Sequence, residues 1–133
     1  MFRWKLPYCV VFAAAFAPLA PAHHSVSGQF DTSKSFQITG VVSRVEWVNP
    51  HTQIYVDVKQ ADGSKITYKL ESHPVAFMRK SGLSKADLVG DGRPVTLTAH
   101  PALGEPHMGY LLYLKLAEGR EIQFAKLPGT EQP

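Results

Sequence analysis

The stretch that decides the fold reads QIYVDVK (residues 53–59), ADGS (residues 61–64) and KITYKLE (residues 65–71). In both outer segments apolar and polar side chains alternate, which is the period of a strand with one buried face. Asp62-Gly63 between them is a favoured pair for a tight hairpin turn. The stretch therefore predicts an antiparallel β-hairpin.

The segments on either side extend this pattern. QITGVVSRVEWV (residues 37–48) predicts a preceding strand with a bulge at Gly40, and Asn49-Pro50 predicts the turn after it. After the hairpin, PVAFMRK (residues 74–80) has a proline near its start and Gly82 just beyond its end, which predicts one short helix. Residues 85–88 add at most a short turn. Further strands are expected over residues 94–99, 110–116 and 121–124.

Three strands, a helix and two or three more strands fit an all-β fold with one short helix, a small Greek-key barrel of the OB type. In such a barrel the helix closes one end between the third and fourth strands. A six-stranded sandwich of different topology is the alternative. The expected division is an extended arm over residues 23–35, the barrel over 36–127 and a frayed tail over 128–133.

The first 22 residues have the features of a cleaved signal peptide. Arg3 and Lys5 supply positive charge, the ten-residue apolar run 8–17 is too short to span a bilayer, and Ala20-Pro21-Ala22 offers small residues at a cleavage site. Cleavage after Ala22 predicts a periplasmic protein that does not insert into the membrane. An uncleaved anchor or a buried N-terminal helix is the other interpretation.

Charge and cysteine content narrow the chemistry. The formal net charge of +3 includes both leader cations, so from residue 23 onward 12 basic side chains face 11 acidic ones. A charge near zero gives no support for nucleic-acid binding. The single cysteine, Cys9, lies in the leader, which excludes disulfides, zinc-thiolate sites and a cysteine nucleophile from the predicted exported protein.

Four motifs together carry a resemblance: Ala22-His23-His24-Ser25, the segment GVVSRVEWVNPH (residues 40–51), Asp62-Gly63 and Gly90-Asp91-Gly92. The chain resembles a family of small exported bacterial proteins with a domain of unknown function. In that family a signal peptide precedes His-His-Ser and a GxVxxVEWxNPH motif. The resemblance implies export and a common fold from His23 to about Phe124, and it implies no particular activity.

All six histidines follow the predicted cleavage site. Cleavage after Ala22 would give His23 both a free α-amine and an imidazole, which can chelate one metal ion in a ring. With His24 or a histidine of the folded domain, the donors would be all nitrogen, a set that suits Cu(II). A solvated N-terminus without a ligand is the alternative for this pair.

The other candidate ligands lie on turns and strand ends. His51 follows Asn49-Pro50 and is expected at the barrel mouth beside Trp47, an aromatic residue on the predicted ligand face. His100, His107 and Met108 surround the last long loop, where imidazole and thioether donors would suit monovalent copper. The alternatives are a structural turn histidine and a Met108 side chain that packs on a tyrosine.

The sequence therefore predicts an exported protein that binds a small ligand or a transition metal. Copper is the predicted metal, and the predicted role is its sequestration or delivery. A non-metal module that binds an envelope protein or a glycan is the alternative, and a copper enzyme is the third. No serine-nucleophile elbow, HExxH motif or phosphate-binding glycine loop occurs in the chain. An enzymatic role consequently has less support than binding.

Overall fold

A computed structural model describes residues 25–129. The predicted signal peptide, the predicted ligands His23 and His24, and the last four residues of the predicted tail lie outside the described residues.

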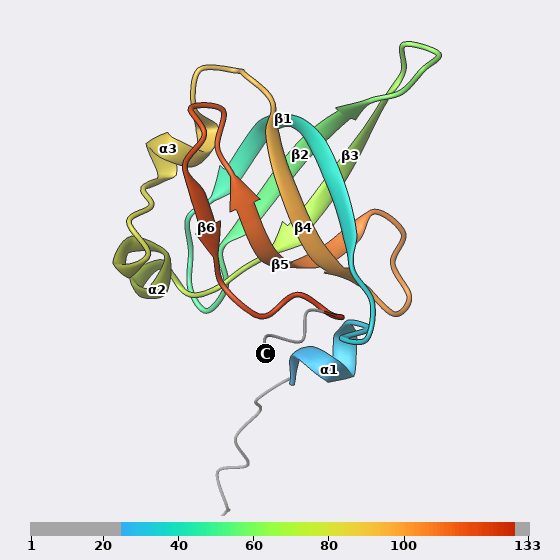
Figure 1. Cartoon of the computed structure of the whole chain (residues 1–133), viewed down its shortest axis with the longest axis vertical. Helices are drawn as coiled ribbons and strands as arrows, with labels where there is room; N and C mark the ends of the chain where they lie inside the picture. Colours follow the sequence, from blue (N-terminus) through green and yellow to red (C-terminus); the bar gives the residue numbers. More distant parts are fainter. Residues whose placement is uncertain (1–24, 130–133) are drawn as a thin grey trace, which may run out of the picture.

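In the described part of the chain six strands form one sheet. Their bounds are β1 (Phe36–Glu46), β2 (Gln53–Lys59), β3 (Lys65–Glu71), β4 (Val95–Pro101), β5 (Met108–Lys115) and β6 (Glu121–Gln123). The strand order is β3-β2-β1-β4-β5-β6, and β3 also pairs with β5, which closes the first five strands into a barrel (Figure 1). β3 and β5 are parallel, whereas the other pairs are antiparallel.

This topology confirms the predicted small all-β barrel of OB type. The five strands close in the order 1-2-3-5-4, and the helical segment lies between β3 and β4 as predicted. The strand β6 is an addition that pairs with the second half of β5.

Gly40 is a corner of the barrel and not the predicted bulge. β1 pairs with β4 from Phe36 to Gly40 and with β2 from Val41 onward, and its register shifts between Val42 and Arg44. A Cβ atom on Gly40 would lie 2.5 Å from the Asp57 carbonyl oxygen. The glycine is therefore needed because two backbones approach closely where β1 changes partner.

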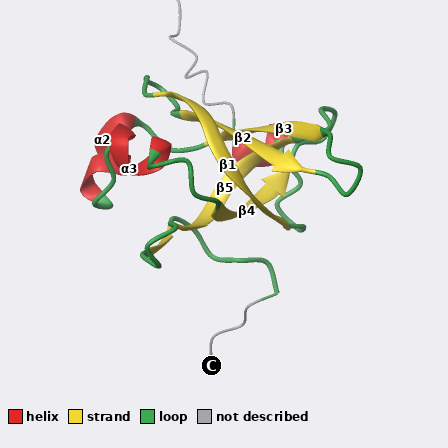
Figure 2. Cartoon of the chain, turned by 90° about the horizontal axis from the view of Figure 1, so that it is seen from above, coloured by secondary structure: helices red, strands yellow, loops and turns green. Residues whose placement is uncertain are grey.

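Within the described residues three short helices form where one was predicted. They are α1 (Val26–Gln29), α2 (Val75–Lys80) and α3 (Lys85–Val89), and α2 and α3 lie together on one side of the barrel (Figure 2). In α3 the Ser84 side chain accepts from the Asp87 N–H and the Asp87 side chain accepts from the Ser84 N–H, a capping box that the sequence reading missed. No helix within residues 25–129 has the length and apolar character to span a membrane.

The predicted extended arm also differs from the structure. Residues 26–29 form α1, and Phe30 after it is 2% exposed. Leu103 N–H donates to the Gln29 carbonyl and Asp31 N–H donates to the Pro101 carbonyl, so this segment pairs with the β4–β5 loop. Burial of one large aromatic side chain, which an extended solvated arm would expose, accounts for the difference.

Two apolar clusters hold the fold together. The barrel core contains fully buried residues such as Ile54, Leu70, Leu97 and Leu111. A second group, which we name the outer aromatic cluster, consists of Phe30, His73, Phe77, Tyr110 and Phe124, with ring centroids 4.2–6.4 Å apart between neighbours. This cluster ties α1, α2 and the segment after β6 to β5.

Candidate functional site

The clearest site begins with His51, in the turn between β1 and β2. Its Nδ1 atom pairs with the Oε1 atom of Glu71, the last residue of β3. The β2–β3 register explains the contact, because Gln53 lies opposite Glu71 and His51 is two residues before Gln53. The Glu71 side chain is only 12% exposed, whereas that of His51 is 37% exposed.

This pairing fixes which imidazole nitrogen can bind a ligand. With Nδ1 directed at the Glu71 carboxylate, the Nε2 atom of His51 is the nitrogen left for an external partner. Histidines that bind metals commonly direct their other ring nitrogen to a carboxylate, which orients the ring and makes the ligating nitrogen more basic. The pair is thus suited to hold a metal ion, although one imidazole does not make a complete site.

His51 and Glu71 line a cavity of about 310 Å³. The other described lining residues are Ser25, Val26, Gln29, Phe30 and Pro50. Ser25 is the first described residue and directly follows His24 in the chain.

Behind Glu71 the outer aromatic cluster holds two more polar side chains. Tyr110 lies opposite Glu71 in the β3–β5 register, and its hydroxyl is 3.2 Å from His73 Nδ1. Burial lowers the pKa of His73, and the nearby His51 lowers it further. Burial raises the pKa of Tyr110, and the Glu71 charge adds to this effect. His73 is therefore uncharged at neutral pH, and its Nδ1 atom shares a hydrogen bond with the Tyr110 hydroxyl.

One end of this region holds buried polar atoms without partners. His73 Nε2 and Thr52 Oγ1 have none among the described residues, although Thr52 N–H donates to the His73 carbonyl. Such atoms are uncommon in protein interiors and indicate a place where water or a ligand group is accommodated.

The structure does not bring the other predicted ligands to His51. His100 is 8% exposed, and its Nδ1 atom lies 2.7 Å from the Lys34 carbonyl oxygen, as in a structural histidine. Trp47 packs against the barrel core. Within residues 25–129 no group of three or more His, Cys, Asp or Glu side chains is placed to hold a metal ion.

His107 and Met108 line a different cavity, of about 480 Å³, together with Phe36 and Tyr68. Gln29 and Phe30 line the His51 cavity. They also line a separate hollow that they share with residues of the β4–β5 loop. His107 and Met108 therefore belong to a second site, which we name the Tyr68 cavity.

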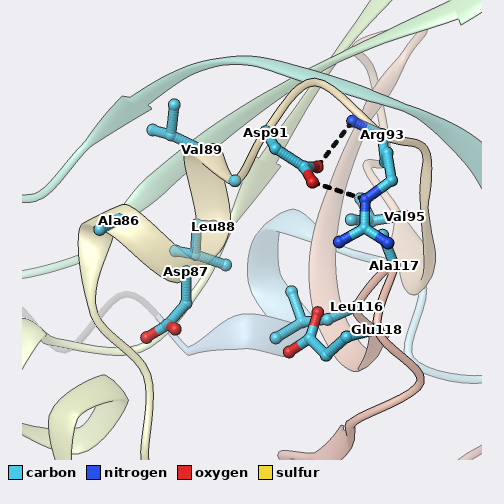
Figure 3. Close-up of a pocket in the computed structure, with 11 residues that line it drawn as sticks. Ala86, Asp87, Leu88, Val89, Asp91, Arg93, Val95, Leu116, Ala117 and Glu118 are labelled. Atoms are coloured by element: carbon cyan, nitrogen blue, oxygen red, sulfur yellow. Dashed lines mark hydrogen bonds and ion pairs between the residues drawn. The ribbon is translucent and has the colours of Figure 1, made fainter.

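A third hollow, beside α3, has a different character. Its ionised side chains already have partners, and Arg93 Nε is 2.6 Å from Asp91 Oδ2 (Figure 3). Arg120, which lies outside the lining, pairs with Asp87 at 3.0 Å and with Glu118 at 3.4 Å. Its described lining residues thus offer no unpaired charge to a ligand.

Sequence reasoning missed Glu71, His73 and Tyr110. The Asp62-Gly63 turn was a usable signal for Glu71, because the hairpin register that it sets places Glu71 opposite Gln53. No comparable signal points to the contact between His73 and Tyr110, which depends on the parallel pairing of β3 with β5.

Comparison with known proteins agrees with the motif-based resemblance. The chain matches a family of unknown function (DUF6152) over residues 11–109. This protein belongs to that family. The match includes the Asn49-Pro50-His51 turn and ends at Gly109, early in β5. No curated protein and no solved structure matches the chain.

Proposed function

We propose that this DUF6152 protein binds copper in the periplasm and serves in its sequestration or delivery. The ligands would be the α-amine and imidazole of His23, the imidazole of His24 and Nε2 of His51. The single observation that supports this proposal best is that Ser25, the residue after His24, lines one cavity with the His51–Glu71 pair.

The donor chemistry is consistent with this assignment. An amine and imidazoles form a nitrogen-rich set, and such sets favour Cu(II), which also has the highest affinity in the series of divalent first-row metals. Free amines and imidazoles have ordinary pKa values of about 7.7–8.0 and 6.5, so few protons must be displaced at neutral pH.

The described residues supply too few metal ligands, so the proposal requires further ligands from elsewhere in the chain. His51 and Glu71 alone do not form a group that could hold a metal ion. The remaining donors must therefore come from the segment before Ser25, and the α-amine requires cleavage after Ala22. A protein that begins elsewhere would lose the chelate ring.

The test uses the exported protein. Mass spectrometry of periplasmic material should give His23 as its first residue. Copper titration should then show one tight site, and the same protein with an acetylated α-amine should bind copper at least tenfold more weakly. Equal affinity would contradict the proposed chelate. Absence of copper binding in both would favour the alternative, a module that binds an envelope protein or a glycan.

A further inference from the structure

The Tyr68 cavity shares no lining residue with the His51 cavity and has a wall of aromatic rings. The Phe36 and Tyr68 ring centroids are 5.8 Å apart, and the His107 ring meets Tyr68 edge-on at 5.0 Å. Met108 and Leu103 add apolar surface from the β4–β5 loop. With a volume of about 480 Å³, the cavity is in the size range of small-molecule sites.

The rings of this wall are held in place by the backbone. Gly109 has no room for a side chain, since a Cβ atom there would lie 2.8 Å from both the Phe36 ring and the His100 carbonyl oxygen. Phe36 therefore packs directly on the backbone of β5. A rigid aromatic wall loses little conformational entropy when a ligand binds.

His107 is held in an unusual conformation. It is the one non-glycine residue within 25–129 that has a positive φ, 59°. Its carbonyl accepts from Lys69 N–H at 2.9 Å, which ties the loop to β3. A strained backbone that is held by its neighbours occurs more often at binding sites than elsewhere.

The charge at the rim indicates the kind of ligand. Glu105 lines the cavity, and no lysine or arginine is among the described lining residues. Among the acidic residues within 25–129, Glu105 alone has no ion pair or hydrogen bond. The other nine have such partners: Asp31, Glu46, Asp57, Asp62, Glu71, Asp87, Asp91, Glu118 and Glu121.

We propose that the Tyr68 cavity binds a small organic cation of the alkylammonium class. The faces of Tyr68 and Phe36 would attract the cation through their ring quadrupoles, and the Glu105 carboxylate would balance its charge. A neutral sugar would leave the unpaired carboxylate unused, and an anion would be repelled by it. This site is separate from the proposed copper site and does not depend on it.

The test is an NMR titration of the ¹⁵N-labelled exported protein, free of metal, with choline. Its neutral isostere 3,3-dimethylbutan-1-ol is the control ligand, and the pH is 8, where imidazoles are ordinarily uncharged. Choline should shift the amide signals of residues 104–109 and 68, and the isostere should bind at least tenfold more weakly. Equal affinities of the two ligands, or no shifts with choline, would overturn the proposal.

Substitutions provide a second readout. Glu105→Gln lies at an exposed position where folding is not at stake, and it should weaken choline binding about two- to fivefold. The matched control Glu118→Gln removes the same charge beside α3 and should leave choline binding unchanged. Equal effects of the two substitutions would mean that only net charge matters, which would contradict the site.

Two sources could present this cation: a free amine or a choline lipid headgroup. Sedimentation with phosphatidylcholine vesicles, against phosphatidylglycerol vesicles, distinguishes them. The lipid headgroup would be assigned if the protein binds phosphatidylcholine vesicles only and Glu105→Gln weakens that binding. Choline binding without vesicle binding would assign a free ligand.

Discussion

Two carboxylates of this small barrel, Glu71 and Glu105, line different cavities and differ in burial and in pairing. Glu71 is nearly buried and already paired with the His51 imidazole. Glu105 is exposed on a loop and is unpaired among the described residues. A buried carboxylate needs a partner because its desolvation is costly, and through that partner it can orient a ligand-binding imidazole. An exposed carboxylate remains available to meet a charged ligand directly.

The two cavities also differ in the elements that form their walls. The His51 cavity is bounded by α1, so its shape depends on how the chain enters the barrel. The Tyr68 cavity is bounded by β1 and β3, which strand pairing fixes, and by the β4–β5 loop. This loop contacts α1, since Leu103 N–H donates to the Gln29 carbonyl, but no α1 residue lines the cavity. We therefore expect changes near the N-terminus to affect the first cavity more than the second.

The largest expected effect is that of Phe30→Ala. Phe30 is 2% exposed and packs on Tyr110 with ring centroids 5.5 Å apart. Its truncation should lower the free energy of unfolding by about 3–5 kcal/mol, measured by urea denaturation. Leu103→Ala, at a 60% exposed position on the facing loop, should cost less than about 1 kcal/mol. Equal losses would contradict the anchoring role of Phe30.

A smaller effect is expected from Glu71→Gln. This change keeps the size of the side chain but removes the charge that orients His51, so copper affinity should fall by about 10–100-fold in a competition titration. Glu105→Gln, the matched change in the other cavity, should leave copper affinity unaltered. If both substitutions weaken copper binding equally, the distinction between the two carboxylates is wrong.

The smallest effect is a pH dependence of stability. Because burial lowers the pKa of His73, the unfolded chain takes up a proton near pH 6.5 while the folded protein resists it until a lower pH. This contribution to stability is complete above pH 6.5 and decreases as the pH falls below it. Urea denaturation between pH 7.5 and 5.5 should show the decrease, and His73→Phe should reduce it. An unchanged slope in His73→Phe would contradict this assignment.

The sequence predicted the barrel well because its strands follow local rules. Alternation over residues 53–71 and the Asp62-Gly63 turn determine the hairpin, and the order of elements determines the closure. Phe30 shows where such rules fail. A four-residue helix has too little periodicity to recognise, and its formation depends on a distant partner, Tyr110.

The site was predicted only in part for the same reason. His51 stands out through its turn motif. In the structure His100 Nδ1 lies beside the Lys34 carbonyl oxygen and His107 lines a different cavity from His51, and the assignment of these histidines as metal ligands stays a prediction. The roles of Glu71 and Glu105 depend on which side chains lie opposite them in space. The carboxylates look alike in the sequence, and only the register and the loop path distinguish them.

The most direct test of the copper site is pulsed electron paramagnetic resonance of the one-to-one Cu(II) complex of the protein that begins at His23. The wild-type protein should show coupling to the remote nitrogen of several imidazoles, and His51→Gln should lose one of them and bind copper more weakly. Identical spectra and equal affinities would mean that His51 does not bind the metal, which would contradict the account.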